Sequence, residues 1–177
     1  MTEIFMEALL VVDVQKAMFA SGAPHDGRAV VARIAGLLEK ARGSRAPVFF
    51  VQHDGGPGDE FCRDLPGFAI CDEVMPRGEP VIVKTRRSAF TGSDLEARLR
   101  AAHVDHIVLC GMQTEFCINA ALMGAVDRGF RVTAVRDAHT TFDSEIMPAE
   151  KIIALHHRVW LGAPAALAPA SEVAFTA

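Results

Sequence analysis

Three ionisable residues follow segments that are typical of buried strands. Asp13 lies at the end of the first such segment, Lys84 follows the third, and Cys117 lies on the first turn of the helix expected after the fourth. In a doubly wound parallel sheet, ligands bind beyond the carboxyl ends of the strands. The sequence therefore predicts that a carboxylate, an ammonium and a thiol meet at one edge of a sheet.

These residue types have a combined chemistry. A cysteine on the first turn of a helix feels the positive end of the helix dipole, which favours the thiolate. A nearby carboxylate can accept the thiol proton, and a lysine holds the resulting charges in place. The backbone N–H groups of Gly111–Gln113, just before this helix, are suitable donors to an oxyanion. Together these are the parts needed for acyl transfer from an amide or ester.

Each residue also has an interpretation without catalysis. A carboxylate at a strand end can cap a turn or pair with an arginine, and a lone cysteine is more often core packing. Lys84 can be an ordinary solvated lysine, as we expect for Arg86 and Arg87 beside it. The catalytic interpretation is favoured because all three alternatives would have to hold together.

The elements that must position these residues alternate along the chain. Buried strands are predicted at Ala8–Val14, Pro47–Gln52, Pro80–Val83, His106–Cys110 and Arg131–Val135, with an edge strand at Glu172–Phe175. Helices are predicted at Arg28–Ala41, Ser93–Ala102, Thr114–Arg128 and Ala149–Leu161. This alternation predicts an α/β fold, a three-layer α/β/α sandwich around a six-stranded, mainly parallel, Rossmann-like sheet. The irregular stretch His53–Glu79 is long enough to be a functional loop or lid.

Composition limits the class of protein. The 177 residues are 50% apolar, which suits one globular domain spanning residues 1–177. Lys and Arg number 18 against 22 Asp and Glu, a net charge of −4, and this balance disfavours nucleic-acid binding. The apolar run Ala8–Val12 is too short to span a membrane, and no positively charged region precedes it. We therefore expect a soluble, cytoplasmic protein with neither a nucleic-acid nor a membrane partner.

The four cysteines show no pairing pattern. Cys62, Cys71, Cys110 and Cys117 form neither a Cys-x-x-Cys motif nor a zinc-finger spacing with histidine. A domain of this size needs no disulfide framework. Cys110 lies within a predicted strand and is expected in the core, whereas Cys62 and Cys71 receive no role.

The segments that carry Asp13, Lys84 and Cys117 resemble a known family. VVDVQKAMF (Val11–Phe19), VIVKTRRSAF (Val81–Phe90) and LCGMQTEFCINAA (Leu109–Ala121) are similar to three signatures of the isochorismatase-like cysteine hydrolases. DAHTTFD (Asp137–Asp143) resembles the segment after that family's fifth strand, and order and spacing agree from about residue 8 to residue 175. The resemblance implies that Asp13 is the general base, Lys84 the charge stabiliser and Cys117 the nucleophile.

The resemblance also implies local geometry. It implies a cis peptide between Met112 and Gln113, with the N–H groups of Gln113 and Cys117 forming one oxyanion hole. If the strand order is 3-2-1-4-5-6, the third strand lies two positions, about 9–10 Å, from the first. Lys84 must then reach inward along its own side chain to meet Asp13.

Softer expectations concern the substrate and a metal. Phe19 and Phe90 are expected as pocket walls, with Gln15 and His53 as further substrate-site residues, although the two phenylalanines are equally consistent with core packing. For both His53 and His139, the sequence leaves two roles open: contact with the substrate, or a hydrogen bond donated to a neighbouring carbonyl. Nicotinamidases of the family bind a metal through an Asp-x-His pair and a later His. Here VQHDGGPGDEF has His53 and Asp54 in the reverse order, and no second His precedes His103. We therefore expect no metal and no cofactor.

The leading functional hypothesis is a metal-independent cysteine hydrolase. It would cleave a C–N bond in a small amide, carbamoyl or lactam compound through a thioester. The alternatives are a catalytically silent binding protein or a redox-sensing thiol protein on the same fold, or a nicotinamidase-type member; vinyl-ether cleavage is disfavoured because members that catalyse it lack the cysteine. The resemblance also implies a homodimer or homotetramer, with Gly162–Ala170 either contacting a partner or forming a surface helix and turn.

Overall fold

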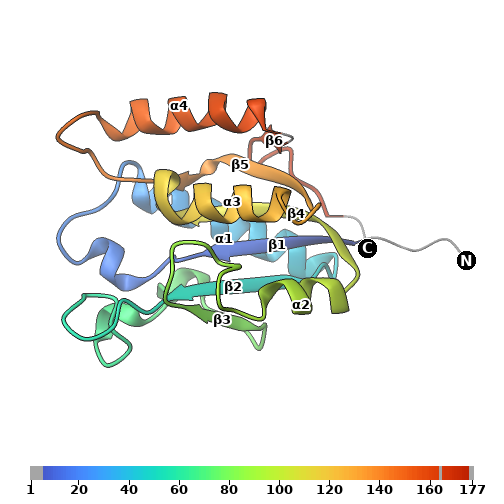
Figure 1. Cartoon of the computed structure of the whole chain (residues 1–177), viewed down its shortest axis with the longest axis horizontal. Helices are drawn as coiled ribbons and strands as arrows, with labels where there is room; N and C mark the ends of the chain where they lie inside the picture. Colours follow the sequence, from blue (N-terminus) through green and yellow to red (C-terminus); the bar gives the residue numbers. More distant parts are fainter. Residues whose placement is uncertain (1–5, 164, 176–177) are drawn as a thin grey trace, which may run out of the picture.

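A single parallel sheet organises the chain. The computed structural model describes residues 6–163 and 165–175. Its strands are β1 (Met6–Val12), β2 (Val48–His53), β3 (Val81–Lys84), β4 (Val104–Met112), β5 (Arg131–Thr140) and β6 (Ala165–Ala168). All neighbouring strands pair in parallel, in the order β3-β2-β1-β4-β5-β6 (Figure 1). The predicted strand order and α/β class are confirmed.

Helices cover both faces of the sheet. The longer helices are α1 (Gly27–Gly43), α2 (Leu95–Ala101), α3 (Asn119–Val126) and α4 (Ala149–Gly162). Short turns are η1 (Lys16–Phe19), η2 (Pro66–Phe68), η3 (Asp72–Val74) and the π-helical turn η4 (Thr114–Ile118). α1 lies behind the sheet in Figure 1, and α2 and α3 lie in front. None of the helices in the described ranges is long and apolar enough to cross a membrane.

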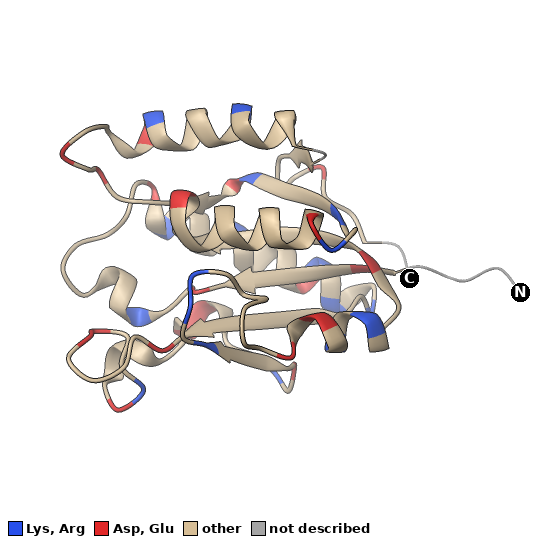
Figure 2. Cartoon of the chain, in the orientation of Figure 1, with Lys and Arg blue, Asp and Glu red and all other residues tan. Residues whose placement is uncertain are grey.

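The two hydrophobic cores follow the alternation of side chains along β1. Leu9 and Val11 pack with the buried face of α1, whereas Leu10 and Val12 pack with α2, α3 and Trp160 of α4. A strand buried on both faces must be apolar throughout, which explains the continuous hydrophobic run in the sequence. Basic and acidic residues are distributed over several elements (Figure 2).

The prediction for the sixth strand is wrong. The edge strand is Ala165–Ala168, which pairs with β5 from Val132 to Val135, and not Glu172–Phe175. The segment Glu172–Phe175 instead buries its apolar side chains against the α1 face of the sheet. There Lys40 of α1 donates hydrogen bonds to the carbonyls of Ala170 (2.8 Å) and Val173 (2.9 Å). The segment expected to contact a partner or form a surface helix therefore contains the sixth strand.

Gly111 permits β4 to approach β1 at the edge where the strands end. It pairs with Val12 and has a φ of +128°, a conformation that L residues rarely adopt. A Cβ atom placed on it would lie 2.0 Å from the Val12 carbonyl oxygen. Asp13 directly follows Val12, so this contact lies beside the predicted catalytic acid.

We predict that Gly111→Ala lowers the free energy of unfolding by about 3 kcal/mol or more, because neither the backbone angle nor the space suits alanine. Gly36→Ala is the matched control, since Gly36 lies inside α1 and a Cβ atom added to it would meet nothing within 4 Å. It should raise stability by about 0.4–1 kcal/mol. Denaturant unfolding measures both values, and wild-type stability of Gly111→Ala would contradict this packing.

Candidate active site

Asp13, Lys84 and Cys117 meet at the carboxyl end of the sheet. The Lys84 Nζ lies 2.7 Å from Asp13 Oδ2 and 3.3 Å from Cys117 Sγ. The side chains of Asp13 and Lys84 are fully buried, at 0% exposure each. β2 separates β3 from β1, so the lysine side chain crosses the end of β2 to reach the aspartate. One ammonium therefore contacts both the acid and the thiol.

The backbone around Asp13 explains its placement. Asp13 has a left-handed φ of +52°, a conformation that aspartate tolerates better than most residues. Its N–H donates to the Val51 carbonyl at 2.9 Å, extending the β1–β2 pairing by one residue. On the other side of β2, the Asp54 N–H donates to the Lys84 carbonyl at 2.8 Å. These bonds fix both strand ends from which the ion pair projects.

Burial determines where the thiol proton resides. It raises the pKa of the Cys117 thiol to about 12, and the negative charge of Asp13 adds to that shift while Lys84 opposes it. Burial also raises the pKa of Asp13, with Lys84 and the Cys117 thiol acting in the opposite direction. A pKa raised in this way is consistent with a thiol that must give its proton to a base before the sulfur can attack.

Cys117 lies on a wide turn rather than on a regular helix. The residues predicted to begin one helix at Thr114 instead form η4, in which the Ile118 N–H donates to the Gln113 carbonyl at 3.1 Å. Such π-turns occur frequently at functional sites. The preceding peptide bond, Met112–Gln113, is cis. α3 then continues from Asn119 to Val126.

A cavity of about 300 Å³ opens beside Cys117. Its lining comprises Asp13, Met18, His53, Asp59, Phe61, Arg87, Gln113, Phe116 and Cys117. Asp13 Oδ1 accepts no hydrogen bond from any residue in the described ranges. The cavity therefore presents a buried acceptor, a thiol and the turn that precedes the thiol to whatever enters it.

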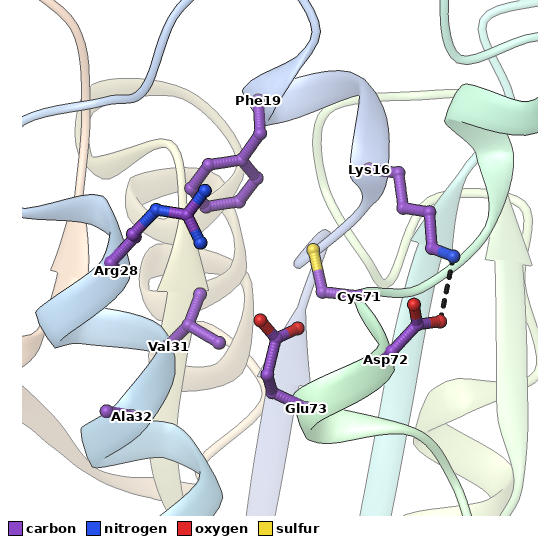
Figure 3. A pocket seen from close by; sticks show the side chains of 8 residues that line it. All are labelled: Lys16, Phe19, Arg28, Val31, Ala32, Cys71, Asp72 and Glu73. Carbon is purple, nitrogen blue, oxygen red and sulfur yellow. Dashed lines mark ion pairs between the residues drawn. The ribbon is translucent and has the colours of Figure 1, made fainter.

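Phe19 and Phe90 do not line this cavity, and their predicted role as its walls is corrected. Phe90 is buried in the core and stacks on Phe130, with ring centroids 6.2 Å apart. Phe19 faces a different cavity of about 420 Å³, where Figure 3 shows its ring beside Arg28 and the Cys71 sulfur. An aromatic residue in a motif does not reveal which side of its turn it faces, so the sequence alone did not decide this.

Phe61 and Phe116 provide the aromatic walls instead. The Arg87 guanidinium lies 4.2 Å from the centre of the Phe116 ring, which places a cation at the cavity. Sequence reasoning missed these residues and treated Arg87 as solvated. The available signals were the position of Phe116 directly before Cys117 and that of Arg87 three residues after Lys84.

Of the two further residues predicted at the substrate site, His53 lines the cavity and Gln15 does not. Gln15 is fully buried and does not line the cavity. Its amide donates to the His53 carbonyl (2.9 Å) and accepts from the His53 N–H (2.8 Å), so it fixes the end of β2. His53 lines the cavity, tilted against Phe61. Burial and the Lys84 charge lower the pKa of His53, so its ring is neutral at neutral pH.

Asp54 and the three other cysteines lie away from the cavity lining. Asp54 pairs with Arg63, with 2.6 Å between Oδ2 and Nε, and this contact lowers the pKa of Asp54. Within residues 6–163 and 165–175, no three His, Cys, Asp or Glu side chains gather as metal ligands would. All four cysteines are free, and Cys62, Cys71 and Cys110 are buried.

Known proteins are similar to this chain in sequence and in structure. The chain is 40% identical over 147 residues to a streptothricin hydrolase of Streptomyces noursei, covering 81% of this chain but only about half (52%) of that hydrolase. It is 34% identical over 149 residues to maleamate amidohydrolase of Pseudomonas putida, covering 73% of this chain and 70% of that enzyme.

Solved structures agree over nearly the whole chain. An isochorismatase from Pseudomonas putida superposes with a TM-score of 0.89 at 26% identity, covering 98% of this chain and 93% of the other. N-carbamoylsarcosine amidase from Thermoplasma acidophilum superposes with a TM-score of 0.80 at 26% identity, covering 96% and 99%. A family model described as the isochorismatase domain matches residues 7–157. Because this family model covers most of the chain and the fold and sequence agree, the chain belongs to the isochorismatase family.

Proposed function

We propose that this protein is a cysteine hydrolase that cleaves the C–N bond of a small amide, carbamoyl or lactam compound through a thioester. The observation that carries the proposal is the single Lys84 ammonium in contact with both Asp13 and Cys117, beside a cavity. Maleamate amidohydrolase and N-carbamoylsarcosine amidase, which this chain resembles, are named for hydrolysis of C–N bonds.

The first half of the reaction forms the thioester. Asp13 accepts the proton of the Cys117 thiol as the sulfur attacks the substrate carbonyl carbon. The carbonyl oxygen becomes an oxyanion that accepts hydrogen bonds from the backbone N–H groups of Gln113 and Cys117. When the intermediate collapses, the protonated Asp13 donates its proton to the departing nitrogen, the C–N bond breaks, and an amine or ammonia leaves.

The second half regenerates the thiol. Asp13, again a carboxylate, accepts a proton from water as the water oxygen attacks the thioester carbon. The C–S bond then breaks, the carboxylic acid product forms, and the sulfur takes the proton back from Asp13. One water is consumed and one C–N bond is cleaved, so the cycle balances with Asp13 and Cys117 as its only proton carriers and without an oxidant or reductant.

Lys84 lowers the cost of proton transfer between the two buried groups. At rest its charge is balanced by Asp13 at 2.7 Å, and after transfer it is balanced by the sulfur at 3.3 Å. The buried site therefore has the same net charge before and after the transfer, which avoids the large cost of an unpaired buried ion. The raised pKa of Asp13 makes the carboxylate a stronger base.

The cavity supports a small substrate. Its volume of about 300 Å³ is at the lower end for ligand pockets. Phe61 and Phe116 provide flat apolar walls, whereas Arg87 and Asp59 supply charge. We therefore place the scissile group at Cys117 and the rest of the substrate between the two aromatic rings.

Cys117→Ala is expected to abolish turnover on a panel of small amides, lactams and carbamoyl compounds, by about 1,000-fold or more. The measurement is amine or ammonia release, with the covalent intermediate detected by intact mass. Cys110→Ala, which removes a buried thiol outside the cavity, is the matched control and should keep the wild-type rate per folded molecule. Equal activity of Cys117→Ala and wild type would overturn the cysteine mechanism.

The ion pair predicts a coupling that a double-mutant cycle can measure. Asp13→Asn and Lys84→Met should each lower the free energy of unfolding by about 3–5 kcal/mol, because each strands the opposite charge in the interior. The free energy of unfolding of the double variant should fall by at least about 1 kcal/mol less than the sum of the two single losses. The two single variants and the double variant should all be inactive.

Arg98→Met is the control for this cycle, because it breaks an exposed ion pair of the same length, 2.7 Å. It should change stability by less than about 1 kcal/mol. Strict additivity of the Asp13 and Lys84 losses would contradict the pairing.

A further inference from the structure

His139, whose role the sequence left open, lies behind the turn that carries Cys117. It is at the end of β5 and is buried, with 2% exposure. Its Nδ1 lies 2.9 Å from the hydroxyl of Thr114, and its Nε2 lies 2.9 Å from Nε2 of His157 on α4. Thr114 is fully buried and is the first residue of η4, directly after Gln113. Three side chains thus connect α4 to the start of the nucleophile turn.

The hydrogen bonds between Thr114, His139 and His157 depend on which nitrogen of each ring carries its proton. Two Nε2 atoms at 2.9 Å share a single proton, so one ring donates and the other accepts. A neutral His139 that donates through Nε2 accepts the Thr114 hydroxyl proton at Nδ1, whereas one that accepts at Nε2 donates to the Thr114 oxygen. Either way, the His139 ring is held at both nitrogens, by Thr114 at Nδ1 and by His157 at Nε2.

The surroundings keep both rings neutral. Burial, together with His157 and His156, lowers the pKa of His139 to about 3. Burial, Arg136 and His156 also lower the pKa of His157, although a backbone hydrogen bond to Arg136 acts in the opposite direction. At neutral pH the row of Thr114, His139 and His157 side chains is therefore uncharged and adds no charge to the site around Lys84.

α4 also holds the residue that follows the turn. Trp160 Nε1 donates to the Asn119 side-chain oxygen at 2.9 Å, and Asn119 begins α3. The Trp160 ring meets His139 edge-on, with centroids 5.0 Å apart. Between these two attachments lies the five-residue turn with Cys117, whose Glu115 also accepts from the Thr141 hydroxyl at 2.9 Å.

We propose that Thr114, His139 and His157 are positioning residues for the nucleophile turn. They hold Cys117 Sγ against Lys84 and set the direction of the Gln113 and Cys117 N–H groups. The inference rests on the proposed function for its effect on turnover, because a nucleophile misplaced by about 1 Å can lose about 100-fold in rate. None of the three lines the cavity, so their loss should change kcat rather than KM.

Two pairs of variants distinguish the loss of a hydrogen bond from the change in side-chain volume. Thr114→Val and His157→Leu remove a hydrogen-bonding group, whereas Thr114→Ser and His157→Gln retain one. The Val and Leu variants should lose about tenfold or more in kcat with KM within about twofold of wild type. The Ser and Gln variants should keep kcat within about threefold. Equal kcat in all four variants would overturn the inference.

Alkylation of Cys117 by iodoacetamide, located by peptide mass mapping, tests the inference without any substrate. A sulfur moved away from Asp13 loses its proton acceptor, so Thr114→Val should react about tenfold more slowly than wild type while Thr114→Ser reacts normally. Alkylation of Cys110, which is buried on β4, measures whether the variant has lost packing throughout the domain. Faster alkylation of both Cys110 and Cys117 in Thr114→Val would overturn the inference, because it would indicate a merely structural role.

The two readouts distinguish the inference from the proposed function. Wild type without activity on any amide, combined with slowed Cys117 alkylation in Thr114→Val, would reject the hydrolase and support the positioning role. Hydrolysis that requires Cys117, combined with unchanged alkylation and kcat in Thr114→Val, would support the hydrolase and reject the positioning role.

Discussion

The buried ion pair between Asp13 and Lys84 is the constraint around which the site is built. A charge pair with no solvent exposure persists only when its geometry is good, because desolvation costs several kcal/mol per ion. The sheet supplies that geometry: β1 and β3 end at the same edge with one strand between them, and a lysine side chain is long enough to cross it. Cys117 contacts the same ammonium, so this cation can be balanced by the carboxylate or by the sulfur.

The meeting of Asp13, Lys84 and Cys117 could be predicted because their residue types are unusual where they occur. A carboxylate and an ammonium directly after buried strands require partners, and parallel strands bring such residues to one edge. The edge strand could not be predicted, because Ala165–Ala168 has no β-branched residue and becomes a strand only by pairing with β5. The helix-dipole argument from the sequence did not include burial and the charge of Asp13, which both raise the pKa of Cys117.

In the proposed mechanism, the site divides into residues that perform the chemistry and residues that contact the rest of the substrate. Asp13, Lys84 and Cys117 come from strand ends and from the turn after β4, all held by backbone pairing. Phe61 and Asp59 come from the irregular segment between β2 and β3, and Arg87 from the loop after β3. Loops tolerate change better than strands do. This division is consistent with a family whose members share the fold at about 26–40% identity but are named for different substrates.

Ultraviolet absorbance of the Cys117 thiolate tests the central claim most directly, as the difference between wild type and Cys117→Ser from about pH 5 to about pH 10. The chain contains no tyrosine, so no phenolate absorbance obscures the thiolate. If Asp13 neutralises Lys84 at rest, no thiolate step should occur in this range, because burial raises the pKa of Cys117 to about 12. A full thiolate signal already present at neutral pH would contradict the account, since Lys84 would then be paired with sulfur rather than with Asp13.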